Sequence, residues 1–347
     1  MSRGIIENMA TMRIWRSLAG IGSAIALAAA ALAVPATARA DNLDNLESAF
    51  DQALGKEERG PRTYRTAFEA QIATLANASQ GRIGVAAMDL ATGQTVDVLG
   101  AQRFPMASTS KIAIAATFLE GVEKGRWSLT SQFPLMIPVR SAAHSTAVAP
   151  VQPGEYMQAI DLIELMLTRS SNPATDALLA AVGGPQAVND WVRRAGISEF
   201  RIDRDIATLV RDDGSIDPAA VIDQRDSATP LAMVHLLSGL YRGKWLRQSS
   251  RDVILGAMER CRTGKRRIRA LLPEDATVLH KTGSLYNTSS DIGIVRTPDG
   301  RAFALAIYVT GQGSRLNREA RIAQLARALY DGYASGLASQ RRTAYRQ

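Results

Sequence analysis

The spacing of hydrophobic positions changes along the chain, and each change marks a different kind of element. Residues 82–89 alternate small and apolar side chains, a turn follows at 91–93, and residues 94–99 run back, which predicts a β-hairpin. Over residues 108–246 the apolar positions recur three and four apart instead. Because this spacing is typical of amphipathic helices, we expect a helical middle part.

Strand patterns return towards the end of the chain. Strands are predicted at 277–281, 291–295 and 302–310, and a helix follows at about 317–334. The sequence at 297–300, Thr-Pro-Asp-Gly, is a strong turn signal between the last two strands. If these strands pair with the hairpin, they form an antiparallel sheet flanked by terminal helices, with a helical lobe inserted. The expected fold class is therefore α/β plus all-α.

The first forty residues differ from the rest. Arg13 and Arg16 precede an apolar run at 18–34, and the small-residue site Ala-Arg-Ala follows at 38–40. This order is typical of a cleaved signal peptide. A membrane anchor is the alternative, but it needs about 20 apolar residues. We predict a signal peptide over 1–40 and a periplasmic or secreted protein with no stable membrane anchor after cleavage.

The mature chain contains no repeat and no low-complexity linker, so we expect a single domain over 41–347. In this domain, the sheet lobe should comprise about 41–105 and 260–335, and the helical lobe about 106–259.

Composition narrows the classes of function. The chain is 46% hydrophobic and 21% charged, as in ordinary globular proteins. Its net charge of +8 becomes +5 without residues 1–40, because 37 basic and 32 acidic residues remain. The basic segment 262–269 is short and has no interleaved aromatic residues, so we expect no nucleic-acid partner. The histidines have no ligand spacing, so we expect no metal and no other cofactor. The sole cysteine, Cys261, cannot form an internal disulfide.

A serine and a lysine stand three residues apart where the helical pattern begins. Ser108-Thr109-Ser110-Lys111 starts with a residue type that is favoured at helix starts. Positions three apart on a helix share a face, so the Lys111 amine should lie beside the Ser108 hydroxyl. A serine nucleophile needs its base in this arrangement. Taken alone, however, the segment is better explained as an ordinary helix start.

Two further polar motifs follow. Ser170-Ser171-Asn172 comes after a helical stretch, where a polar loop would look the same. Lys281-Thr282-Gly283-Ser284 ends an apolar strand, where a lysine often only protects a strand edge. In this order, the three motifs match the S-x-x-K, S-x-N and K-T-G set of class A β-lactamases and penicillin-binding proteins.

The chain is similar to class A serine β-lactamases from about Leu46 to Tyr333. This resemblance implies a two-lobed fold with the active site between the lobes, and relatives are usually monomers. Other segments that resemble the family are Phe104-Pro105-Met106-Ala107, Gly183-Gly184-Pro185, Arg225-Asp226, Thr229-Pro230, Thr263-Gly264, Ile268-Arg269-Ala270-Leu271-Leu272-Pro273 and Asp291-Ile292.

The resemblance implies a catalytic role for four side chains. Ser108 is the nucleophile, Lys111 is the base in acylation, Ser170 relays a proton to the leaving nitrogen, and Lys281 tunes Ser170 electrostatically. The backbone N–H groups of Ser108 and Ser284 should form the oxyanion hole, worth about 3 kcal/mol per donor. To act as a base near pH 7, Lys111 needs a pKa about 3 units below that of a free lysine.

Five residues are expected to bind the substrate. Asn172 should hydrogen-bond the amide side chain of the substrate, and the segment Thr282, Gly283 and Ser284 should receive its carboxylate together with the lysine of the same motif. Arg267 matches a position where some class A relatives carry a carboxylate-steering arginine. The alternative is that Arg267 belongs to the solvated basic segment.

The resemblance fails at the step that releases the product. Class A enzymes activate the hydrolytic water with a glutamate on an Ω-shaped loop, and Ile206 stands at that position here. The second partner of the water falls on Val210. Asp205 is a possible substitute base, although it is shorter than glutamate and one position away. The pair that closes the loop, Arg204 and Asp226, is present.

Three functions remain open at this point. The first is a serine hydrolase that is acylated by β-lactams at Ser108 and hydrolyses them with slow deacylation. The second is a D-alanyl-D-alanine peptidase acting on peptidoglycan, which would explain the absent glutamate. The third is a non-catalytic module that binds a β-lactam or a peptide, although a binding pocket needs no paired nucleophile and base. The expected partner is a small-molecule β-lactam or a D-Ala-D-Ala peptide, and we expect a monomer.

Overall fold

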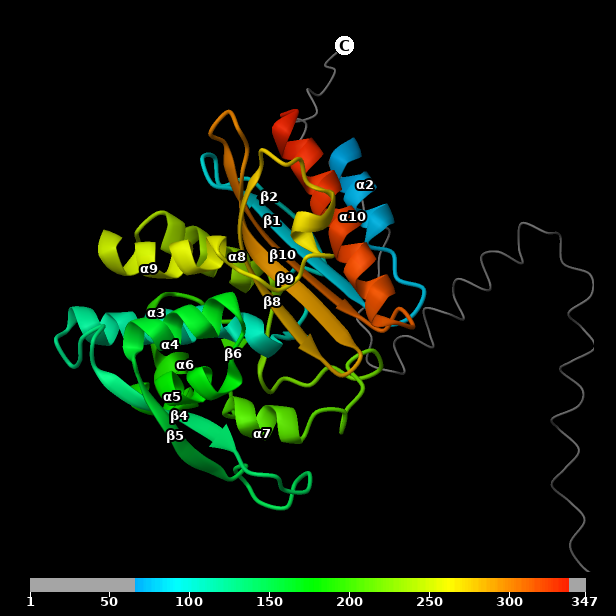
Figure 1. Ribbon diagram of the computed structural model, residues 1–347. Helices are drawn as coiled ribbons and strands as arrows, with labels where there is room; N and C mark the ends of the chain where they lie inside the picture. Colours follow the sequence, from blue (N-terminus) through cyan, green and yellow to red (C-terminus); the bar gives the residue numbers. More distant parts are fainter. Residues whose placement is uncertain (1–65, 337–347) are drawn as a thin grey trace, which may run out of the picture. The chain divides into compact units, whose positions relative to one another are not determined.

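A five-stranded antiparallel sheet forms the first lobe, in the order β2-β1-β10-β9-β8 (Figure 1). The computed structural model describes residues 66–336, so the predicted signal peptide lies outside the described residues. The hairpin and the C-terminal strands predicted from the sequence are confirmed, and they pair with each other. The strands are β1 (Ile83–Asp89), β2 (Thr95–Val98), β8 (Thr277–Leu285), β9 (Thr288–Arg296) and β10 (Ala302–Thr310).

Helices cover both faces of this sheet. The helices α2 (Ala67–Leu75) and α10 (Arg315–Ala334) lie on one face, and α8 (Pro230–Tyr241) lies on the other (Figure 1). Along β1, Val85 and Ala87 pack into the core under α10, whereas Ala86 packs into the core shared with the helical lobe. Successive side chains of a strand point to opposite faces, so β1 must be small or apolar throughout.

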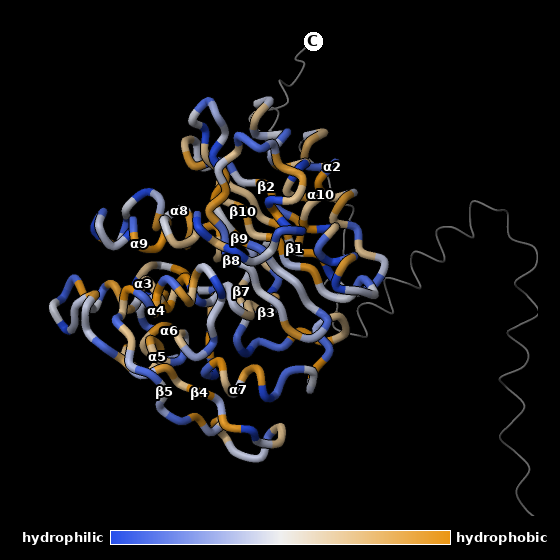
Figure 2. Tube along the Cα trace, viewed as in Figure 1, coloured by the Kyte–Doolittle hydropathy of each residue, from blue (hydrophilic) through white to orange (hydrophobic). Residues whose placement is uncertain are grey.

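The second lobe is built around a helix that is buried over most of its length. Every residue of α3 (Lys111–Glu123) from Lys111 to Leu119 is buried. In Figure 2 the helices around it carry hydrophobic stretches, in orange, beside hydrophilic ones. No helix within residues 66–336 is long and apolar enough to cross a membrane. The surrounding helices are α4 (Ala159–Thr168), α5 (Asn172–Val182), α6 (Pro185–Arg194), α7 (Ile206–Arg211) and α9 (Gln248–Glu259).

The helical lobe also contains strands that the sequence pattern did not predict. The strands β4 (Gln132–Pro138) and β5 (Val151–Gln158) form an antiparallel hairpin. Both contain proline and are mostly exposed or half-buried, so they lack the alternation that marks a strand with one buried face. The predicted fold class is confirmed, with this hairpin added to the lobe. The short strands β3 (Phe104–Pro105), β6 (Phe200–Arg201) and β7 (Ser227–Ala228) form a further small sheet.

Candidate active site

The three sequence motifs lie on segments that contact one another between the two lobes. Ser108 lies in the short 3-10 helix η1 (Ala107–Ser110), Lys111 begins α3, Ser170 precedes α5, and Lys281 lies on β8. Ala107 and Ser170 have positive φ angles of 48° and 60°. Strained backbone of this kind is found at functional sites, where the surrounding structure holds it in place.

Gly283 allows β8 to approach the helix that carries the nucleophile. A Cβ atom at this position would lie 2.7 Å from the carbonyl oxygen of Met106 and 3.1 Å from the Cβ of Ala107. The Thr109 hydroxyl holds η1 by hydrogen bonds with the Met106 carbonyl at 2.8 Å and with the Tyr308 hydroxyl at 3.0 Å. The third motif therefore needs glycine because a side chain would push the strand away from η1.

The Ser170 hydroxyl links the two lysines. Its Oγ accepts from Lys281 Nζ at 2.9 Å and from Lys111 Nζ at 3.3 Å. Lys111 Nζ also donates to the Ser170 carbonyl and to Asn172 Oδ1, each at 2.8 Å. Among the hydrogen bonds of the described residues, none joins Lys111 Nζ to Ser108 Oγ. The resting amine is therefore held by Ser170 and Asn172, and such catalytic contacts often tighten only with substrate.

Both lysines lie in surroundings that disfavour their charge. Burial and the neighbouring Lys281 hold the pKa of Lys111 well below its usual range, although Asp176 opposes this shift. Burial also lowers the pKa of Lys281 to about 8. Lys111 is fully buried, so an unprotonated amine avoids the cost of a desolvated charge. A base that works near neutral pH requires a shift in this direction.

Arg267 does not belong to a solvated basic face. It is only 1% exposed, and its guanidinium donates to the carbonyls of Gly283 at 2.8 Å and Ser290 at 2.7 Å. It also donates to Ser284 Oγ at 2.6 Å and pairs with Glu319 at 3.1 Å. These contacts join β8, β9 and α10 beneath the segment expected to bind the substrate carboxylate. Carboxylate steering by Arg267 stays a prediction, and any such effect passes through its contact with Ser284.

The segment expected to form the Ω-shaped loop is closed by the predicted ion pair. Arg204 Nε lies 2.6 Å from Asp226 Oδ2. Ile206 begins α7 and is buried, whereas Val210 on the same helix is 49% exposed. Asp205 caps α7, where its carboxylate accepts a first-turn backbone N–H at 2.7 Å. Whether Asp205 also acts as a base stays a prediction.

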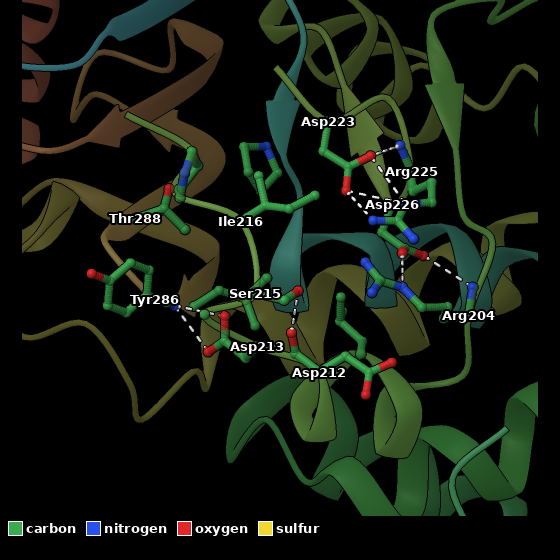
Figure 3. A pocket seen from close by; sticks show the side chains of 15 residues that line it. Arg204, Asp212, Asp213, Ser215, Ile216, Asp223, Arg225, Asp226, Tyr286 and Thr288 are labelled. Carbon is green, nitrogen blue, oxygen red and sulfur yellow. Dashed lines mark hydrogen bonds and ion pairs between the residues drawn. The ribbon is translucent and has the colours of Figure 1, made fainter. Parts of the chain in front are cut away.

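A pocket lies between this segment and the turn that joins β8 to β9 (Figure 3). The Asp213 carboxylate accepts the backbone N–H of Tyr286 at 2.9 Å, as the dashed lines of Figure 3 show. In the lining of the pocket, Asp223 pairs with Arg225 at 2.8 Å. The segment is therefore tied to the far end of the strand that carries the third motif.

Sequence reasoning missed two groups of buried polar side chains. Asp176, which is 4% exposed, accepts backbone N–H groups at the start of α7. Behind β8, His280 Nδ1 lies 2.9 Å from an Asp291 oxygen, and Cys261 hydrogen-bonds to the same histidine. For Asp176, the available signal was its spacing of four residues from Asn172 of the second motif. For His280, it was the position just before Lys281 of the third motif.

The group behind β8 connects to the active site. Burial opposes the charge of His280, but Asp291 outweighs it and raises the pKa of the histidine to about 9. Burial likewise opposes ionisation of Cys261, but hydrogen bonding with His280 lowers its pKa to about 7. Thr263 Oγ1 contacts Cys261 at 3.3 Å and Thr282 Oγ1 at 2.6 Å, which extends the chain of contacts to the third motif. Between residues 66 and 336, no group of three or more His, Cys, Asp or Glu could hold a metal ion.

Comparisons with known proteins agree with this fold. A model of the β-lactamase enzyme family matches residues 67–333. The β-lactamase OXY-2 of Klebsiella oxytoca is 31% identical, over 77% of this chain and 89% of its own length. A variant of the class A β-lactamase of the last common ancestor of Gram-negative bacteria has a similar structure, with a TM-score of 0.66 and 34% identity over 78% of this chain and 100% of that chain. A variant of PBP-A was solved as an acyl-enzyme complex with penicillin G. Its structure matches with a TM-score of 0.65 and 25% identity, over 77% of this chain and 96% of that chain.

The fold and the comparisons define a serine enzyme with a sheet lobe and a helical lobe. The chain belongs to the β-lactamase enzyme family, and its relatives place it with the class A serine β-lactamases. The resemblance inferred from the three motifs is therefore confirmed.

Proposed function

We propose that this protein is an exported serine hydrolase that β-lactams acylate at Ser108 and that releases the hydrolysed product slowly. The observation that carries the proposal is the Ser170 hydroxyl, which accepts from both Lys111 and Lys281. Two buried amines on one hydroxyl form a path for protons beside the segment that holds Ser108.

Acylation in this proposal uses groups from all three motifs. The Ser108 oxygen attacks the lactam carbonyl carbon while neutral Lys111 accepts the hydroxyl proton. The carbonyl electrons move onto oxygen, where the backbone N–H groups of Ser108 and Ser284 stabilise the charge. The carbon–nitrogen bond then breaks, and Ser170 protonates the leaving nitrogen while it recovers a proton from Lys111. Lys281 keeps positive charge near the substrate carboxylate.

Deacylation lacks an obvious base. A water that attacks the Ser108 ester must lose a proton, and general-base catalysis contributes about 100-fold to 10,000-fold to such steps. Ile206 supplies no base and no hydrogen bond, and Val210 supplies none either. Asp205 is the nearest candidate that the sequence offers, with Asp212 and Asp213 more remote, but its carboxylate already caps α7. We therefore expect the acyl-enzyme to accumulate.

Nitrocefin turnover by the purified mature protein tests both steps. We expect a burst of product equal to the enzyme concentration, followed by a slow steady state, and an intact-mass adduct of one penicillin that persists. The Ser108→Ala variant should show neither the burst nor the adduct. Rapid turnover without a burst would overturn slow deacylation, and loss of that activity in Asp205→Asn would identify the substitute base. An adduct that persists in Ser108→Ala would exclude this nucleophile.

A D-alanyl-D-alanine peptidase is the second candidate, and Ile206 in place of a carboxylate favours it. The similarity to PBP-A, whose variant forms an acyl-enzyme with penicillin G, supports the same alternative. Offering nitrocefin and a D-Ala-D-Ala peptide to one preparation distinguishes the two. Release of D-alanine with multiple turnovers, together with a single turnover of nitrocefin, would identify the peptidase. A non-catalytic module would form no adduct with either compound.

Export rests on the sequence pattern of residues 1–40. Expression with the full leader should place the protein outside the cytoplasm, with a mature N-terminus at Asp41. Replacing Ala38 and Ala40 by arginine should block the cleavage. Recovery of the uncleaved chain from the cytoplasm in the unmodified protein would refute this assignment.

A further inference from the structure

A buried carboxylate outside the three motifs lies one helical turn beyond the second motif. Asp176 is 4% exposed and follows Asn172 by four positions on α5. Residues four apart on a helix lie on the same face. Asn172 Oδ1 accepts from Lys111 Nζ at 2.8 Å, so this face of α5 is directed towards the catalytic lysine. Asp176 therefore lies on the side of α5 that lines the site.

Both oxygens of Asp176 bind the start of the segment that replaces the usual glutamate. Oδ1 accepts the N–H of Ile206 at 2.7 Å, and Oδ2 accepts the N–H of Ala207 at 2.8 Å. The first N–H groups of a helix have no partner within it, so an ionised carboxylate is well suited to bind them. A neutral carboxylic acid would bind them less well, because one oxygen then carries a proton.

Few other charges face Asp176. Burial raises the pKa of Asp176 to about 6, against the hydrogen bonds from Ile206 and Ala207, which lower it. Of the charges, Asp205 at the cap of α7 raises this pKa and Lys111 on α3 lowers it. The strand β4, which also packs against α5, has no charged residue. The helices α4 and α6 complete the surroundings of α5, and their acidic residues are exposed Asp161, Glu164 paired with Arg260, and Asp190 paired with Arg193.

We propose that Asp176 is a positioning residue that serves as the carboxylate partner of Lys111, setting the charge of this base while it anchors the backbone of Ile206 and Ala207. The proposal rests on the proposed function, because it takes Lys111 as the base of acylation. Ionised Asp176 favours the protonated amine and so raises the pKa of Lys111, against the effect of burial and of Lys281. Acylation requires the neutral amine, so the rate should rise with pH as Lys111 loses its proton.

Loss of the Asp176 charge should increase the acylation rate at low pH, whereas a simple loss of structure would decrease it. Asp176→Asn removes the negative charge, which lowers the pKa of Lys111 and increases the neutral fraction at low pH. The acid limb of the acylation rate should therefore move to lower pH. Asp176→Glu retains the charge and should keep the acid limb close to that of the unmodified protein.

The experiment measures the second-order rate of penicillin adduct formation from pH 5 to pH 9 by intact mass. Asp161→Asn is the matched control, because it removes one exposed carboxylate from the neighbouring helix and should leave the profile unchanged. If the acid limb of the rate profile stays in place in Asp176→Asn, the proposal is overturned, whatever the maximal rate of the variant. Asp176 would then be a structural anchor. Absence of any adduct in the unmodified protein would instead refute the proposed function itself.

A second measurement covers the case in which Asp176→Asn does not fold. Coupling between two titrating groups is reciprocal, so removing the charge of Lys111 must raise the pKa of Asp176. Carboxyl carbon NMR of the unmodified protein and of Lys111→Ala follows the aspartate with the highest pKa. An upward shift in the variant supports the pairing, and an unchanged titration would overturn it.

Discussion

Two buried lysine amines meet at one hydroxyl, and this contact determines what Ser170 can do. Because its Oγ accepts from both Lys111 and Lys281, the hydroxyl proton is free to be donated towards a substrate atom. The positive φ of Ser170 holds this hydroxyl between the lysines, and the same backbone turns its carbonyl towards Lys111. A single residue thus positions the base and relays the proton.

The neighbouring serines of the second motif should behave differently when replaced. Ser170→Ala removes the proton relay and should slow acylation by about 100-fold to 10,000-fold with little change in the melting temperature. Ser171→Ala removes the N-cap of α5 and should cost about 1 kcal/mol of stability while acylation stays near normal. Stopped-flow acylation and thermal melts measure both. Equal acylation rates in the two variants would contradict the relay.

Arg267 is expected both to stabilise the fold and to help bind the substrate carboxylate. Arg267→Ala leaves Glu319 buried with one cation fewer, and breaking a buried pair typically costs about 3–5 kcal/mol. It also frees Ser284 Oγ, so KM for penicillins should rise more than kcat falls, because carboxylate binding acts in ground and transition states alike. Urea unfolding and steady-state kinetics separate the two effects. A destabilised variant with an unchanged KM would restrict Arg267 to the structural role.

At the scale of elements, β8 separates the active site from a second buried charge group. Asp291 raises the pKa of His280 to about 9 in the folded state, above its ordinary value of 6.5. A raised pKa means that the stabilisation is complete below pH 6.5 and is lost as the pH rises through 9. Cys261, with its pKa lowered to about 7, contributes a thiolate partner only above that pH.

His280→Asn should therefore lose stability in a pH-dependent manner. We expect the variant to be less stable than the unmodified protein by at most about 3 kcal/mol near pH 6.5 to 7, with the difference shrinking towards pH 9.5. Urea unfolding at both pH values measures it. His235→Asn, at an exposed histidine, is the control for loss of an imidazole. A difference that does not change with pH would show that packing, and not the charge of His280, stabilises this region.

The elements that could be predicted from the sequence are those in which apolar residues recur at a regular period within one segment. The β1–β2 hairpin and α10 follow from the period of their apolar residues, and the three motifs lie next to one another as their order implied. Arg267 and Asp176 could not be placed this way, because burial of a charge depends on partners far along the chain, such as Glu319 for the arginine. The β4–β5 hairpin was missed since its residues have no buried face to impose a period.

At the scale of the whole molecule, the balance of two chemical steps decides which function the protein has. Groups for acylation come from both lobes, with Lys111 and Ser170 on the helical lobe and Lys281 on the sheet lobe. The groups for deacylation would have to come from the segment between Arg204 and Asp226, which is tied to the sheet lobe through Tyr286 and to α5 through its contacts at the start of α7. The segment is well anchored, so we expect any defect in deacylation to be chemical, because Ile206 offers no carboxylate at the position of the usual glutamate.

Supplying that base should therefore convert a slow acyl-enzyme into a turning-over hydrolase. Ile206→Glu places a carboxylate at the first position of α7, where a negative charge suits the helix start. Proximity to Asp176 and Asp205 should raise the pKa of the new glutamate, which suits a base near neutral pH. We expect deacylation of the penicillin adduct to accelerate by about 100-fold or more. Ile206→Gln is the matched control, because it has the same shape without a base. Decay of the adduct followed by mass spectrometry measures both variants, and equal decay rates would show that general-base catalysis at this position does not limit turnover.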